Sequence, residues 1–238
     1  MRPNRAGMKA FAAAVLCATV LGSAAPDPFD EPPRNLGETL LRDDFERDQA
    51  TGWAFTDASA WRIAKDPQDG DRVLELFGVS KYEPKVRSPL NIALAEGKEF
   101  GAFDLRVKVR STVKDYGHRD LCLIFGYVDP SHFYYVHMAK EADPHAHSVF
   151  LVNGEPRVSI AETRTKGVEW TDGWHEVRLV REPESGLVEF YFDDLQKPIM
   201  TAHDKTFANG RIGLGSFDDK GMFDDLVVKP GGAGARRP

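Results

Sequence analysis

Hydrophobic and polar residues alternate along much of the chain, which is the pattern of half-buried β-strands. In segment 103–110, Phe103, Leu105, Val107 and Val109 alternate with four charged residues. One side of this strand is expected to face a core and the other side water. Similar runs cover 73–77, 132–139, 148–153, 157–161, 175–181, 188–193, 211–217 and 223–229.

Turn signals such as Asn153–Gly154, Asn209–Gly210 and Asp129–Pro130 separate these runs. Only segment 91–98 is predicted to form a short helix. About a dozen strands with no alternation of strands and helices indicate an all-β fold, a two-sheet antiparallel β-sandwich.

The N-terminus has the order of a secretory signal peptide. Arg2, Arg5 and Lys9 precede the apolar run 10–21, and small residues follow at 22–25. The run is too short for a spanning helix, which needs about 20 residues. We therefore expect export, with cleavage after Ala24 or Ala25, and a secreted or periplasmic protein with no membrane span.

The remaining chain is predicted to contain one domain. Residues 26–38 form a proline-rich leader, 39–229 the sandwich, and 230–238 a tail too rich in Gly and Pro to fold. Of the two cysteines, Cys17 lies in the signal peptide, so Cys122 has no disulfide partner. Cys122 lies in the apolar run 121–125 and is expected to be a buried, inert thiol.

Composition and charge narrow the class of partner. The 238 residues are 42% hydrophobic and carry a net charge of −6. Removal of residues 1–25 leaves 28 basic and 37 acidic residues, a net charge of −9. This acidic balance argues against nucleic-acid binding. We expect a monomer.

Several segments resemble concanavalin A-like and laminin-G-like jelly rolls, a superfamily that includes family 16 glycoside hydrolases. The resemblance rests on 43–46 with 52–53, 173–181, 186–193, 206–216 and 223–228. It implies two curved sheets, with a poly- or oligosaccharide bound on the concave face.

Segment 132–157 carries the candidate sugar site. In the run 132–140, Val136 and Met138 are expected to face the core, which places Tyr135 and His137 on the opposite face. In the next strand, 148–153, Phe150 and Val152 are expected to point inward. On this assignment Tyr135, His137, His147 and Asn153 converge on one face, with Arg157 just beyond the following turn.

Aromatic, imidazole, amide and guanidinium groups together suit a sugar, because rings stack and polar groups bind hydroxyls or a carboxylate. A catalytic centre of His137, Tyr135 and His147 is also possible, with an imidazole as general base. Two alternatives stay open: the residues fill the rim between the sheets, or His137, His145 and His147 bind a metal.

The basic segment 81–87 is a second candidate. Lys81, Tyr82 and Arg87 are predicted to line a cleft for an acidic sugar; a solvated connection is the alternative. Carboxylates near the two ends suggest a structural calcium site, because Asp44 and Glu46 lie on the expected first strand and Asp224 on the last. Hard oxygen ligands suit Ca²⁺, and ordinary surface charge is the alternative.

Catalytic motifs are absent from the sequence. It has no acid-pair motif of family 16 hydrolases, no full lyase motif, no Gly-x-Ser-x-Gly, no P-loop and no His-Glu-x-x-His. Three classes of function remain: a carbohydrate-binding protein, a polysaccharide lyase or glycoside hydrolase using a Tyr/His centre, and an envelope adhesion protein of laminin-G-like type.

Overall fold

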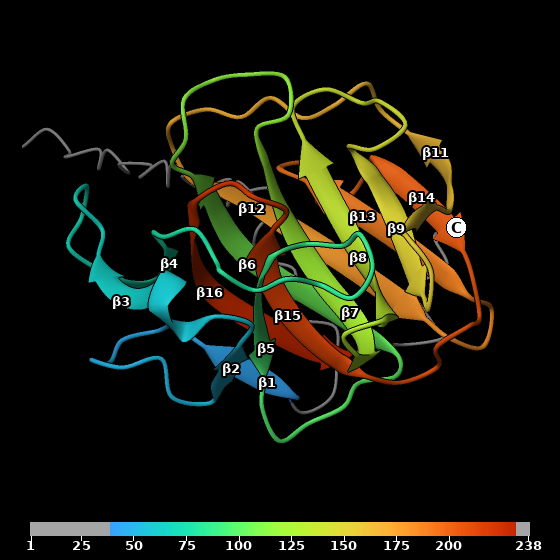
Figure 1. Cartoon of the computed structure of the whole chain (residues 1–238), viewed down its shortest axis with the longest axis horizontal. Helices are drawn as coiled ribbons and strands as arrows, with labels where there is room; N and C mark the ends of the chain where they lie inside the picture. The colour runs from blue at the N-terminus through green and yellow to red at the C-terminus, as the bar shows by residue number, and fades with distance from the viewer. Residues whose placement is uncertain (1–38, 232–238) are drawn as a thin grey trace, which may run out of the picture. The chain divides into compact units, whose positions relative to one another are not determined.

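A computed structural model describes residues 39–231, and in this range the chain folds into two antiparallel β-sheets. Figure 1 shows a seven-stranded sheet in front of a nine-stranded one. The described part has no α-helix, only the short 3-10 turn η1 (Ala58–Ala60). The predicted all-β sandwich is confirmed. The predicted signal peptide and leader, and the tail beyond residue 231, lie outside the described residues.

The nine-stranded sheet contains the first and last strands of the domain. In spatial order its strands are β11 (Ala161–Arg164), β14 (Met200–His203), β13 (Leu187–Phe192), β12 (His175–Glu182), β6 (Phe103–Ser111), β16 (Gly221–Pro230), β4 (Arg72–Leu76) and β3 (Trp61–Lys65), while β1 (Leu41–Asp43) pairs with β16. Because β16 ends at Pro230, the strand extends one residue into the segment predicted as an unfolded tail.

The seven-stranded sheet carries the candidate sugar site. In spatial order its strands are β10 (Val158–Ser159), β9 (Ser148–Asn153), β8 (His132–Ala139), β7 (Asp120–Asp129), β15 (Arg211–Ser216), β5 (Asn91–Ala95) and β2 (Trp53–Phe55).

The helix predicted at 91–98 is wrong, because Asn91–Ala95 forms strand β5. Every residue of this strand is buried. Ala93 and Ala95 belong to the core between the sheets, whereas Ile92 and Leu94 belong to a second cluster on the other side. A strand covered on both faces has a continuous apolar sequence without alternation, which periodicity alone cannot distinguish from a short helix.

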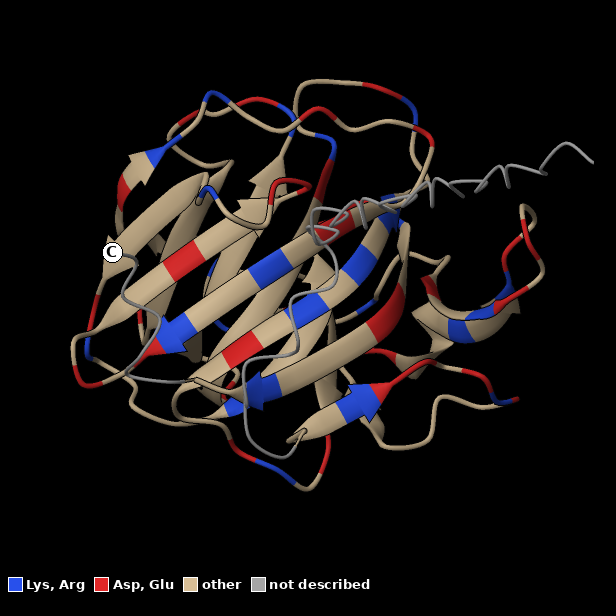
Figure 2. Cartoon of the chain, turned by 180° about the vertical axis from the view of Figure 1, so that it is seen from behind, with Lys and Arg blue, Asp and Glu red and all other residues tan. Residues whose placement is uncertain are grey.

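The nine-stranded sheet has a charged outer face (Figure 2). Phe103, Leu105, Val107 and Val109 of β6 are buried in the core, as predicted from their alternation with charged residues. Ion pairs cross the outer face, including Arg178–Asp104 and Lys108–Asp225, both at 2.7 Å. The charged side chains of this face are therefore in contact with solvent and form ion pairs with one another.

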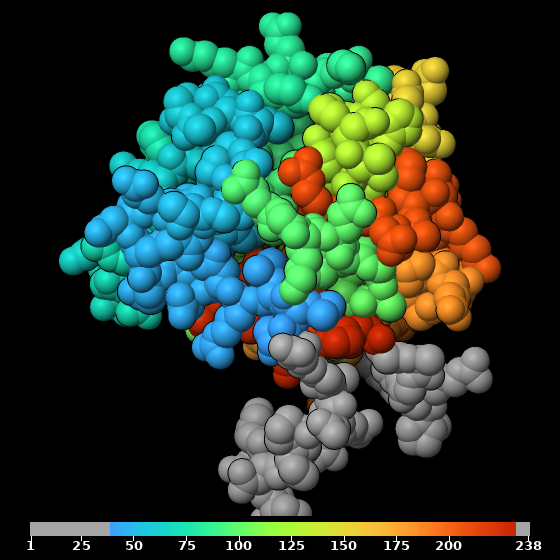
Figure 3. Space-filling model, turned by 90° about the horizontal axis from the view of Figure 1, so that it is seen from below, coloured from blue at the N-terminus to red at the C-terminus, as the bar shows by residue number. Residues whose placement is uncertain are grey.

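Strands β1 and β16 join the two ends of the domain, with Leu41 opposite Val228 and Asp43 opposite Leu226. Figure 3 shows the blue first segment against the red last strand. Asp43 fixes the following turn, because its carboxylate accepts hydrogen bonds from Trp53 Nε1 at 2.8 Å and Arg47 Nη2 at 2.7 Å.

Within residues 39–231, no helix has the length and apolar character needed to cross a membrane.

Candidate functional site

The outer face of the seven-stranded sheet carries a second apolar cluster, separate from the core between the sheets. This outer cluster consists of Ile92, Leu94, Cys122, Ile124, Tyr127, Phe133, Tyr135, Phe150 and Val152. The connection between β4 and β5 crosses in front of β15, β7 and β8 (Figure 1), and its Val86 packs on the cluster. One sheet face is thus charged and wet, whereas this one is apolar and covered.

The predicted faces of β8 are confirmed. Val136 and Met138 lie in the core between the sheets, and Tyr135 lies on the opposite side in the outer cluster. That side is nevertheless covered, since Tyr135 and His137 are only 0% and 4% exposed. Sequence alternation shows which face a side chain occupies, but it does not reveal that a distant loop covers that face.

The inward placement of Phe150 and Val152 is also wrong. Phe150 lies directly opposite Tyr135 in the ladder, and paired residues of antiparallel strands project to the same face. Both Phe150 and Val152 therefore belong to the outer cluster, and Val149 faces the core instead. The rings of Tyr135 and Phe150 stack at a centroid distance of 5.1 Å.

His137 lies against Asp120 and Cys122 of the neighbouring strand β7. Neither residue was predicted to belong to the sugar site. Its Nε2 atom is 3.1 Å from Oδ2 of Asp120. Cys122 is directly opposite His137 in the ladder and two residues from Asp120. Neither ring nitrogen of His137 makes an aligned hydrogen bond, so the close approach to Asp120 is a contact without hydrogen-bond geometry.

Asp120 is held in place by the end of β15. Its Oδ1 accepts hydrogen bonds from Ser216 Oγ at 3.1 Å and from the backbone N–H of Phe217 at 3.2 Å. Oδ2 is the oxygen nearest His137. The alternation Asp120-x-Cys122 places both side chains on the face of His137, and this spacing is the sequence signal that could have identified Asp120.

Arg157 closes the site from the side of β10. Its guanidinium carbon lies 4.1 Å from the ring centroid of Phe217 and 5.2 Å from that of Phe150. One nitrogen, Nη2, donates to the carbonyl of His145 at 2.8 Å, while Nε and Nη1 are buried without a partner. We call Tyr135, His137, Asp120, Arg157 and Phe217 the His137 site.

The Tyr135 hydroxyl lies in the same group of charges. It is buried without a hydrogen-bond partner. Burial raises the pKa of Tyr135 well above its usual value, opposed by the positive charge of Arg157 and reinforced by Cys122 and Asp120. The hydroxyl is therefore protonated at neutral pH and able to donate a hydrogen bond, but it is a poor base.

Of the three residues predicted in segment 81–87, Arg87 contacts residues of the His137 site. The carbonyl of Arg87 accepts a hydrogen bond from the Arg157 backbone, and its guanidinium lies 5.9 Å from the Phe217 ring centroid. Lys81 is exposed and its backbone N–H bonds to Asp57. Tyr82 is half-buried earlier in the same connection.

Two predicted residues are not part of the His137 site. His147 is fully buried, with its Nε2 2.9 Å from Thr165 Oγ1, and burial lowers the pKa of His147 to about 4. Asn153 is exposed and pairs with His132, five residues from the level of His137, which is about 17 Å along a strand. The predicted convergence with His137 is therefore wrong for Asn153. His147 precedes Ser148, the residue opposite His137 in the ladder, and lies near enough for the two imidazoles to interact electrostatically, but its Nε2 faces Thr165.

The predicted calcium ligands are not brought together as a set. Asp44 and Glu46 are exposed, and Glu46 Oε1 accepts a hydrogen bond from the Arg72 backbone at 2.8 Å. Asp224 is buried, and its burial, reinforced by Asp225 and Asp71, raises its pKa to about 6. The first and last strands do pair, and calcium binding stays a prediction.

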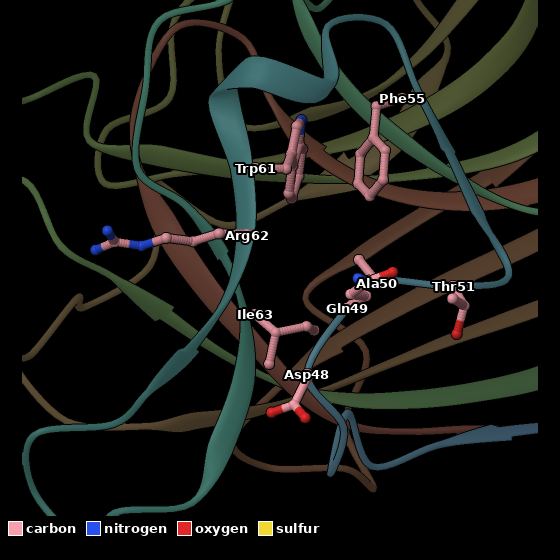
Figure 4. A pocket seen from close by; sticks show the side chains of 8 residues that line it. All are labelled: Asp48, Gln49, Ala50, Thr51, Phe55, Trp61, Arg62 and Ile63. Carbon is pink, nitrogen blue, oxygen red and sulfur yellow. The ribbon is translucent and has the colours of Figure 1, made fainter.

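An open hollow of about 410 Å³ lies beside β2 and β3. Figure 4 shows the rings of Phe55 and Trp61 on one side of it and Asp48 at its far end, while Arg62 points away. The two rings lie 5.5 Å apart, and the indole Nε1 of Trp61 is buried without a partner. An aromatic wall with a polar rim can bind a small polar ligand with an apolar face.

Comparison with known proteins identifies the fold. No family model matches the sequence, and a search of curated proteins finds no match. Among solved structures, the chain is similar to the carbohydrate-binding module CBM66 from Bacillus subtilis, with 18% identity and a TM-score of 0.53 over 75% of this chain and 96% of that one.

Two further structures share the fold. A putative glycosyl hydrolase from Parabacteroides distasonis is 12% identical, with a TM-score of 0.53 over 80% of this chain and 99% of that one. Winged bean acidic lectin complexed with methyl-α-D-galactose is 13% identical, with a TM-score of 0.52 over 81% and 99%. The predicted concanavalin A-like jelly roll is therefore confirmed as the fold.

Proposed function

We propose that this protein binds a poly- or oligosaccharide on the outer face of the seven-stranded sheet, at the rim of the His137 site, where Arg157 and Phe217 are half-buried. The observation that carries the proposal is the set of unpaired polar atoms around one aromatic wall: the Tyr135 hydroxyl, the nitrogens of His137, and Nε and Nη1 of Arg157. A buried polar group without a partner costs about 1–3 kcal/mol. Sugar hydroxyls supply both donors and acceptors to such groups.

The aromatic rings fit the apolar part of the same ligand. Phe217 is half-buried and lies under the Arg157 guanidinium at the rim of the site. A sugar presents C–H groups on its ring faces and hydroxyls around its edge, so an aromatic ring beside hydrogen-bonding groups matches it. The likeness in fold to a carbohydrate-binding module and a lectin agrees with this class of ligand.

The charges at the site favour a sugar that bears a carboxylate. Arg157 and Arg87 both approach the Phe217 ring, at 4.1 and 5.9 Å from its centroid. Guanidinium groups recognise carboxylates by paired, charge-assisted hydrogen bonds. Asp218 lies near enough to interact with Arg157 electrostatically, but neither Arg157 nor Arg87 forms an ion pair within the described residues.

Catalysis on the bound sugar is the second candidate, favoured by the contact between His137 Nε2 and Asp120 Oδ2 at 3.1 Å. A carboxylate beside an imidazole can hold the ring in the orientation that a general base needs. His137 would accept the proton. Tyr135, with its raised pKa, would donate a hydrogen bond to the sugar instead of acting as the base.

We also propose that the protein is exported, on the basis of the order of charged, apolar and small residues in 1–25. Mass spectrometry of the protein recovered outside the cytoplasm would then find a mature N-terminus at Ala25 or Pro26. Recovery of intact Met1–Leu21 on that form would refute export by cleavage.

A glycan array that contains neutral and uronate-bearing polysaccharides tests the proposed binding. Arg157→Gln should weaken binding to the glycan that the wild-type protein selects by at least tenfold, whereas Arg106→Gln, on the opposite sheet face, should leave it unchanged. Product analysis on the selected glycan then separates binding from turnover. Failure of the wild-type protein to bind any glycan, or equal binding by both variants, would overturn the proposal.

A further inference from the structure

Three side chains with metal-ligating atoms meet on the face of the seven-stranded sheet. They are Asp120 and Cys122 of β7 and His137 of β8, all buried, with ligand atoms within 4.8 Å of one another. Within residues 39–231 they form the only group of three or more His, Cys, Asp or Glu residues with this property. The structure does not bring His137, His145 and His147 together as such a group.

The strand register dictates this arrangement. Residues 120 and 122 project to the same face because they are two apart in a strand, and His137 lies directly opposite Cys122 in the antiparallel ladder. The three ligands therefore come from rigid, neighbouring strands and not from a mobile loop. Such a frame holds a metal geometry without ordering cost.

The observed separations fit a tetrahedral metal ion. Bond lengths of about 2.0 to 2.3 Å to N, O and S place neighbouring ligand atoms about 3.5 Å apart. His137 Nε2 is 3.1 Å from Asp120 Oδ2, while the Cys122 thiol donates to the other oxygen, Oδ1, at 3.9 Å. One ligand atom from each residue lies within 4.8 Å of the other two, so a small approach of the side chains would close them on an ion.

The orientation of His137 is an independent observation that points to a ligand. The side chain is 4% exposed, yet neither ring nitrogen has a hydrogen-bond partner. Its Nε2 lies beside Asp120 Oδ2 without being aligned on it. Two ligands of one metal ion also lie side by side without a hydrogen bond between them.

Hydrogen bonds from neighbouring residues hold the Asp120 carboxylate in place, as is usual for the ligands of metal ions. Ser216 Oγ and the Phe217 N–H hold Oδ1 of Asp120, which leaves Oδ2 directed at His137. The Asp120 backbone N–H donates to Asp219 Oδ2 at 2.9 Å. Binding would release the Cys122 thiol proton to solvent, because the thiolate is the ligand.

We infer that Asp120, Cys122 and His137 form a site for a divalent transition-metal ion of the zinc class. A thiolate, an imidazole and a carboxylate are the ligands of Zn²⁺ and Co²⁺, whereas Ca²⁺ requires oxygen ligands only. Three protein ligands leave the fourth tetrahedral position for water or a ligand atom. This site does not depend on the proposed sugar binding, although it lies at the base of the same group of residues.

Cobalt spectroscopy on the full-length, reduced, chelator-treated protein tests the site without any sugar. One equivalent of Co²⁺ should produce the visible bands of a tetrahedral ion and a near-ultraviolet thiolate-to-cobalt band, both removed by one equivalent of Zn²⁺. Cys122→Ser should abolish the thiolate band, and Cys17→Ser should retain it.

The remaining ligands are tested by affinity. Asp120→Asn, which keeps the acceptor for Ser216, and His137→Gln should each weaken Zn²⁺ binding at least tenfold, whereas His203→Gln should not. Circular dichroism establishes that each variant is folded. Absence of stoichiometric Co²⁺ binding by the wild-type protein, or a thiolate band that survives Cys122→Ser, would overturn the site whatever the glycan array shows.

Discussion

Tyr135 stacks on Phe150 with ring planes 17° from parallel, yet its hydroxyl has no hydrogen-bond partner. The neighbouring Tyr134 is equally buried, but its hydroxyl donates to Asp204 and accepts a hydrogen bond from the Phe207 backbone at 3.0 Å. Successive residues of one strand project to opposite faces. One tyrosine is therefore satisfied within the core between the sheets, and the other offers a free donor to the outer face.

This contrast predicts opposite effects on stability. Tyr135→Phe removes a buried, unpaired hydroxyl and should leave the free energy of unfolding unchanged or raise it by up to about 1 kcal/mol, while it weakens glycan binding. Tyr134→Phe leaves the Phe207 N–H without its partner and removes one of the donors to Asp204, so it should lower stability by about 1–3 kcal/mol with binding retained. Urea unfolding and glycan titration of both variants measure these effects.

A loss of more than about 1 kcal/mol in Tyr135→Phe would contradict the assignment, because it would mean that the hydroxyl has a partner within the fold. Unchanged glycan affinity in a stable Tyr135→Phe protein would remove this hydroxyl from the binding site.

The strands were predictable where only one face of a sheet is wet. Segment 103–110 alternates because Asp104 and Arg106 meet water while Leu105 meets the core. Strand β5 does not alternate, because the core covers Ala93 and the outer cluster covers Ile92. The information that distinguishes such a strand from a helix lies in its neighbours and not in its own five residues.

The site was predictable only in part for a related reason. The alternation of side chains along β8 correctly placed Tyr135 and His137 on the face opposite Val136. Arg157, predicted for the same site, lies over the ring of Phe150 on that face. Phe217 follows β15, far from β8 in sequence, so its place beside the site depends on sheet order, whereas Asp120 lies on β7, the strand that precedes β8. The left-handed backbone of His147, at a φ of 51°, takes that residue out of the alternation of β9.

The hollow beside β2 and β3 gives a second, separable binding prediction. A ligand that stacks on Phe55 should quench or shift the fluorescence of the adjacent Trp61, whose ring is 5.5 Å away. Phe55→Ala should weaken such binding at least tenfold if the aromatic wall provides the contact. Phe77→Ala, a half-exposed ring outside the hollow, is the matched control. Equal affinity for the two variants would show that the hollow is not the binding site.

Two buried carboxylates should make stability depend on pH between about 4 and 6. Burial raises the pKa of both Asp219 and Asp224 to about 6, from an ordinary value of 3.8. A raised carboxyl pKa means that the folded state binds the proton more tightly. The resulting stability is present below pH 3.8 and is lost as the pH rises through 6.

Asp224→Asn mimics the protonated form of this residue. It should raise the free energy of unfolding at pH 7.5 by about 1 kcal/mol and reduce the loss of stability between pH 5 and 7.5, in chelator-treated protein. Asp172→Asn, at a fully exposed position, should change neither quantity. If the two variants gave the same pH profile as the wild-type protein, Asp224 would not titrate near pH 6.

The same carboxylate tests the predicted calcium site at the paired ends of the domain. Asp224 lies close enough to Asp225 and Asp71 for both to raise its pKa, and a cation bound there would relieve this repulsion. An ion that binds only the folded state stabilises it by about 2.7 kcal/mol at 100 times its dissociation constant. Calcium should therefore raise the melting temperature at pH 7.5 and chelator should lower it. Asp224→Ala should remove the difference, and Asp172→Ala should preserve it. The contrary outcome is identical melting curves in chelator and in millimolar calcium, for protein that elemental analysis shows to be metal-free. Asp44, Glu46 and Asp224 would then be ordinary charges. The reason is that a cation that binds the folded state must shift the unfolding equilibrium.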